Sequence, residues 1–183
     1  MALPESLKKA IIQMPVKEKD KLLIRLVGKD AVLVDKLYFE LIEDSATIPE
    51  RREEIITRIE RVAGYNQDTP GWILMDMRSL SGDISYHVKV TKDKIGAIEL
   101  NLHLLLSFME RHQEILHNYS SRSDTCALYI AKKAQTIING LAKLDADYRT
   151  DYLKDTNRML MLVHTLCSRM YARQLELPSE LEF

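Results

Sequence analysis

Apolar side chains recur at intervals of three and four residues along most of the chain, which is the spacing of one face of an α-helix. The clearest runs lie in the second half. One such run consists of Ile95, Ile98, Leu102, Leu105, Met109, His112 and Leu116. We predict long helices over residues 95–116, 124–144 and 146–175. The first of these also carries leucines on its other surfaces, so we expect it to be central and covered on several sides.

The first 64 residues show shorter helical patterns. The spacing predicts helices over residues 4–14, 15–28 and 31–43. A fourth begins at Thr47-Ile-Pro-Glu50, a capping box in which Thr47 and Glu50 would satisfy each other's free backbone donors. These back-to-back helices are similar to the hairpins of α-solenoids, although no repeat of fixed length is present.

One segment fits two interpretations. Thr69-Pro70 predicts a helix start, and apolar residues continue at helical spacing from Ile73 to His87. Residues 84–90 also alternate between apolar and polar side chains after Ser81-Gly82-Asp83, as a β-strand would. A single strand would have no partner in this sequence. We therefore predict a helix here, with a possible bend at Gly82.

These patterns predict an all-α protein: a helical bundle of long antiparallel helices preceded by short helical hairpins, superhelix-like in the N-terminal part. The scarcity of turn residues, six Gly and five Pro, supports long helices joined by few loops. We expect a single domain over residues 1–183. A possible subdivision separates hairpins at 1–64 from a long-helix bundle at 69–177, with Gly64–Asp68 as the seam.

Charge and cysteine content limit the partners and the cellular compartment that we expect. The 26 basic and 27 acidic side chains leave a net charge of -1, so no overall attraction to nucleic acid or acidic membranes is expected. Two cysteines cannot form a disulfide framework, and the first residues do not resemble a signal peptide. The most apolar window, residues 95–109, contains Glu99 and His103 and does not fit a membrane span. We expect a cytoplasmic protein.

Polar and titratable side chains concentrate in the middle of the chain. Asp83 and His87 lie four residues apart, so on a helix the carboxylate could orient the imidazole, as in general-base pairs. The alternative is a solvated helix face with a weak ion pair. We take this region as a candidate binding surface, without assigning a catalytic residue. Its members are Arg78, Asp83, His87, Lys92 and Lys94.

The most basic run lies between Lys17 and Lys29. Acidic residues interleave with its lysines, and it contains no aromatic residue to stack on a base. A solvated helix face explains this run, and contact with a phosphate backbone is the alternative.

Other signals of enzymes and metal sites are missing from the sequence. It contains no phosphate-binding glycine loop, nucleophile elbow or His-Glu-x-x-His motif. Glu114 and His117 have the spacing of a di-metal bundle, but the second pair that such a site needs is absent, so we expect no metal and no cofactor.

The leading functional hypothesis is a non-enzymatic helical interaction or scaffold module, with a protein partner or self-association into a homo-oligomer. The first alternative is a nucleic-acid or phosphate-ligand binding protein that uses Lys17–Lys29 or Arg78–Lys94. The second alternative is an enzyme of unrecognised type. We expect no membrane partner.

Overall fold

The computed structural model describes residues 3–43 and 45–182, which form two compact units. One unit comprises the residues up to Ala46 together with Lys89–Thr91, and the other comprises residues 47–88 and those from Lys92 onward. The regular elements of the described residues are all helical, without a strand. The all-α prediction is confirmed.

The first unit contains three short helices, α1 (Glu5–Gln13), α2 (Val16–Val27) and α3 (Ala31–Tyr38). A π-helical turn (Phe39–Glu43) and a 3₁₀ turn (Ser45–Thr47) follow α3. Asp30 caps α3, because its side chain accepts from the backbone N–H groups of Val32 and Leu33. Helices α2 and α3 contact each other, yet none of the three helices contains a buried residue.

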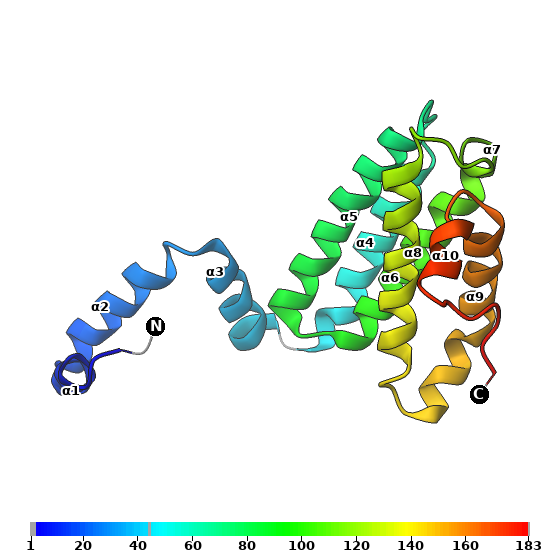
Figure 1. Ribbon diagram of the computed structural model, residues 1–183. Coiled ribbons are helices and arrows are strands. Elements are labelled where there is room, and N and C mark those ends of the chain that lie inside the picture. The colour runs from blue at the N-terminus through cyan, green and yellow to red at the C-terminus, as the bar shows by residue number, and fades with distance from the viewer. Residues whose placement is uncertain (1–2, 44, 183) are drawn as a thin grey trace. The chain divides into compact units, whose positions relative to one another are not determined.

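The second unit is a bundle. It contains α4 (Ile48–Ala63), α5 (Pro70–Thr91) as far as Val88, α6 (Lys94–Arg111), α7 (Gln113–Leu116), α8 (Asp124–Leu141), α9 (Ala146–Thr165) and α10 (Arg169–Gln174). The long helices α4, α5, α6, α8 and α9 run in alternating directions along the bundle (Figure 1). This is the antiparallel arrangement that short connections between long helices favour.

Helix α6 lies at the centre of the bundle and contacts α4, α8 and α9. Its side chains are buried on several sides, and Leu104, Phe108 and Met109 are fully enclosed. A helix that is apolar around most of its circumference must be covered by neighbours on most sides. The central position expected for this segment is therefore confirmed.

Two of the predicted long helices are broken. The helix expected over 95–116 ends at Arg111, and α7 begins after His112, whose backbone leaves the helical region (φ -115°, ψ 30°). The helix expected over 146–175 is divided between Thr165 and Arg169. The second break contacts the end of α7, because the Cys167 N–H donates to the Leu116 carbonyl over 2.7 Å. Because the apolar spacing continues through both breaks, the sequence pattern does not reveal them.

Two expected helix starts have different outcomes. Thr69 caps α5 by accepting from the Trp72 N–H at 3.4 Å. Thr47 makes no such cap at α4, because it closes a 3₁₀ turn with helical angles (φ -85°, ψ -6°), which carry its side chain out of capping position. The capping-box prediction was wrong.

Residues 84–90 lie within the uninterrupted helix α5, so the helical interpretation is confirmed over the strand. Helix α4 belongs to the bundle, because Ile59 and Ala63 are part of its core. The single domain over residues 1–183, with a possible subdivision at 64–68, stays a prediction.

Candidate functional site

The five candidate residues between Arg78 and Lys94 do not gather around one cavity. Asp83 and His87 line a cavity of about 260 Å³ that Arg58 and Tyr86 also line. The guanidinium of Arg78 instead lies over the ring of Tyr129, 5.9 Å from its centre. Lys92 ends α5 in the left-handed conformation (φ 60°), and Lys94 is the exposed first residue of α6.

The carboxylate bonded to His87 is Asp93, not Asp83 as the four-residue spacing suggested. Nε2 of His87 lies 3.1 Å from Oδ2 of Asp93, and both side chains are buried. Asp83 forms an ion pair with Arg58 at 2.9 Å. The left-handed turn at Lys92 reverses the chain, which brings Asp93 back alongside the last turns of α5.

Asp93 is the centre of a polar network that sequence reasoning missed. Arg52, on α4, donates to both of its carboxylate oxygens at 2.7 Å and to Glu99 at 2.7 Å. Asp93 also caps α6 by accepting from the Gly96 N–H at 2.9 Å. An aspartate before a predicted helix is a capping signal, but nothing local points to Arg52.

Arg52 and Asp93 are both charged near neutral pH and form an ion pair within this network. Burial of Asp93, which is 9% exposed, raises its pKa. Hydrogen bonds from Arg52, Gly96 and His87 outweigh burial and lower the pKa to about 2. We interpret the network as a clamp that joins α4, the end of α5 and the start of α6.

We expect the clamp to stabilise the fold in a pH-dependent way. Because the folded pKa of Asp93 is lowered, its contribution is complete above the ordinary pKa of 3.8 and is lost as pH falls through about 2. The Asp93→Asn variant should therefore lose less unfolding free energy than the wild type over this acid range, with a difference on the order of 2 kcal/mol. Urea unfolding at a series of acid pH values measures this, and parallel curves would contradict the assignment.

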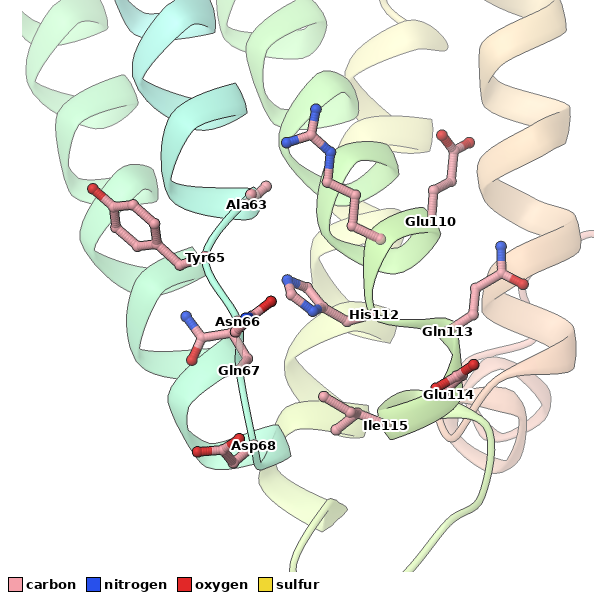
Figure 2. Close-up of a pocket in the computed structure, with 12 residues that line it drawn as sticks. Ala63, Tyr65, Asn66, Gln67, Asp68, Glu110, His112, Gln113, Glu114 and Ile115 are labelled. Atoms are coloured by element: carbon pink, nitrogen blue, oxygen red, sulfur yellow. The ribbon is translucent and has the colours of Figure 1, made fainter.

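A larger cavity, of about 770 Å³, lies elsewhere in the bundle. It forms where the loop after α4 faces the corner between α6 and α7. Figure 2 shows Asn66, Gln67 and Asp68 on one side and Gln113 and Glu114 on the other. The imidazole of His112 extends from the corner toward Asn66 (Figure 2).

Two charged residues of this cavity already have partners. Arg111 donates to the Glu60 carbonyl at 2.6 Å and also forms an ion pair with the Glu60 carboxylate. Glu110 forms an ion pair with Arg158 at 2.5 Å. Glu110 and Glu114 also line this cavity, and Glu114 is exposed.

The described residues contain no group of three or more His, Cys, Asp or Glu side chains arranged to hold a metal ion. The two cysteines are buried, and burial raises the pKa of Cys126 to about 12 and that of Cys167 to about 11. Neither is therefore a ready thiolate nucleophile. Within the described part of the chain, no helix combines the length and the apolar character needed to cross a bilayer.

Known proteins add no further information about the site. Comparison of the chain with protein-family models, with curated proteins and with solved structures gives no match.

Proposed function

We propose that the chain is a non-enzymatic helical interaction module whose N-terminal helices pair with those of a second copy. The observation that supports this is the absence of any buried residue in α1, α2 and α3. Most of their large apolar side chains are instead exposed. The exposed large apolar side chains between residue 3 and the end of the π-helical turn are Leu3, Leu7, Ile12, Val16, Leu23, Ile24, Leu26, Leu33, Val34, Tyr38, Leu41 and Ile42.

The exposed side chains of α2 follow a helical pattern. At 100° per residue, Val16 and Leu23 fall on one face, whereas Lys21 and Arg25 fall on the opposite one. Leu23 and Ile24 are 59% and 72% exposed. Monomeric proteins rarely leave such a large apolar area in water. Covering this set would bury an area on the order of 800 Å² per partner, as in a standard dimer.

Charge favours a second copy as the partner. Residues 1–36 contain eight Lys/Arg and five Asp/Glu (+3), and residues 37–64 contain four Lys/Arg and seven Asp/Glu (-3). If the two chains run in opposite directions, the basic helices of one copy lie beside the acidic segment of the other, which offsets the like charges of the two N-terminal segments. The net charge of -1 provides no comparable attraction to nucleic acid or to an anionic membrane.

Light scattering coupled to size-exclusion chromatography tests the proposal. At roughly 100 µM the wild type should elute with about twice the mass of one 21.2 kDa chain. The double variant Leu23→Lys, Leu26→Lys should elute as a single chain, because it places positive charges on α2 of each copy and the two copies then repel each other. Its circular dichroism spectrum should be unchanged. A matched control, Met75→Lys with Met161→Lys, changes similarly exposed side chains of the bundle and should stay dimeric.

A wild type that remains a single chain at this concentration would overturn the proposal. So would a Leu23→Lys, Leu26→Lys variant that dimerises as the wild type does. Salt-sensitive binding of a single-stranded oligonucleotide by a monomeric chain would support the nucleic-acid alternative instead.

A further inference from the structure

The first unit, up to Ala46, carries opposite charges at its two ends. Residues 1–30 contain seven Lys/Arg and four Asp/Glu (+3), whereas residues 31–46 contain one Lys and four Asp/Glu (-3). Helices α1 and α2 belong to the basic part, and α3 with the π-helical turn belongs to the acidic part. Figure 1 shows α1 and α2 at one end of this unit and α3 at the other. The unit therefore has a basic end and an acidic end.

The basic end has cations that the chain itself does not neutralise. Between the start of α2 and the start of α3, four exposed cations form no ion pair and no side-chain hydrogen bond with the described residues: Lys17, Lys21, Arg25 and Lys29. At the acidic end, Glu40 forms an ion pair with Lys36 at 4.0 Å. A carboxylate has several acceptor positions, so Glu40 can keep this ion pair and also accept from a cation of a second chain.

Two first units can lie side by side in two directions. In a parallel pair the basic ends meet each other and the acidic ends meet each other, so both contacts are repulsive. In an antiparallel pair each basic end meets an acidic end, so both contacts are attractive. A two-fold axis makes these two contacts identical, and each therefore favours the antiparallel direction by the same amount.

We propose that two copies pair their first units in antiparallel directions, with α1 and α2 of each copy against α3 and the π-helical turn of the other. This arrangement rests on the proposed function, because it describes the same pair of chains. It brings exposed apolar side chains of both ends together: Val16 and Leu23 are 71% and 59% exposed at the basic end, and Leu41 and Ile42 are 74% and 68% exposed at the acidic end. Burial of these side chains stabilises the pair, and charge selects its direction.

Sedimentation equilibrium at low salt tests the direction with two charge-reversal variants. Lys17→Glu with Lys21→Glu leaves residues 1–30 with five Lys/Arg and six Asp/Glu (-1), and Glu40→Lys with Glu43→Lys leaves residues 31–46 with three Lys and two Asp/Glu (+1). Each variant alone should associate at least about tenfold more weakly than the wild type, because both contacts then join segments of like charge. An equal mixture of the two variants should pair about as tightly as the wild type, because both contacts again join opposite charges.

The control Lys132→Glu with Lys154→Glu reverses two exposed lysines of α8 and α9 and should leave the association unchanged. A wild type that pairs, together with reversal variants that pair at least as tightly, would overturn the antiparallel direction and leave the proposed function standing. This is the result expected of a parallel pair, because each reversal reduces the like charge that its contacts bring together. A mixture that pairs no more tightly than its components would also overturn the arrangement. A wild type that stays a single chain would overturn the arrangement and the proposed function together.

Discussion

Replacement of Gly96 with alanine is expected to lower the free energy of unfolding by about 2–4 kcal/mol. A Cβ atom at this position would overlap Oδ2 of Asp93 and lie 2.5 Å from Nε of Arg52. These atoms belong to the ion pair that joins α4 to α6, so the added methyl group must push the two charges apart. The loss combines overpacking with the disruption of a partly buried ion pair.

Gly82→Ala is the matched control for this substitution. Gly82 also lies within a helix, but nothing surrounds the position where its Cβ would be placed. Alanine is the better helix former, so this variant should gain about 0.5–1 kcal/mol. Urea unfolding followed by circular dichroism compares the two variants with the wild type. Equal effects of the two substitutions would contradict the tight packing around Asp93.

The second large effect is expected at Leu104. Its side chain is fully enclosed in α6, so Leu104→Ala should lower the free energy of unfolding by about 3–5 kcal/mol through lost burial and a residual cavity. The same substitution at Leu23, on α2 and 59% exposed, should cost less than about 0.5 kcal/mol. Both values are measured by urea unfolding of dilute protein, so that association does not contribute.

This pair of variants separates residues that stabilise the fold from residues that are free to bind. A large loss at Leu23 in dilute solution would show that α2 is already packed within a single chain. That result would remove the basis for assigning the exposed face of α2 to a second copy.

The fold was predictable because its main signals are local. The spacing from Ile95 to Met109 reveals a helix with apolar residues on most sides, and such a helix must lie at the centre of a bundle. Thr69 and Pro70 give a helix start that the structure confirms. The break at His112 was not predictable, because a buried histidine continues the apolar spacing even though its backbone leaves the helix.

The polar network and the large cavity depend on contacts between distant segments. Arg52 meets Asp93 only after α4 and α6 pack together, and no spacing rule connects residues 41 positions apart. Asp83 and His87 satisfy a local rule, yet the left-handed turn at Lys92 supplies a different carboxylate. The cavity likewise requires the antiparallel packing that sets residues 63–68 opposite residues 110–115.

The central claim is that the apolar faces of α1, α2 and α3 are uncovered in one chain and become covered by a second. Hydrogen exchange measured by mass spectrometry at about 1 µM and about 100 µM protein tests it directly. The amides of residues 5–38 should exchange quickly in the dilute sample and more slowly in the concentrated one, whereas those of α6 should be equally protected in both. Exchange across residues 5–38 that does not change with concentration would contradict the claim.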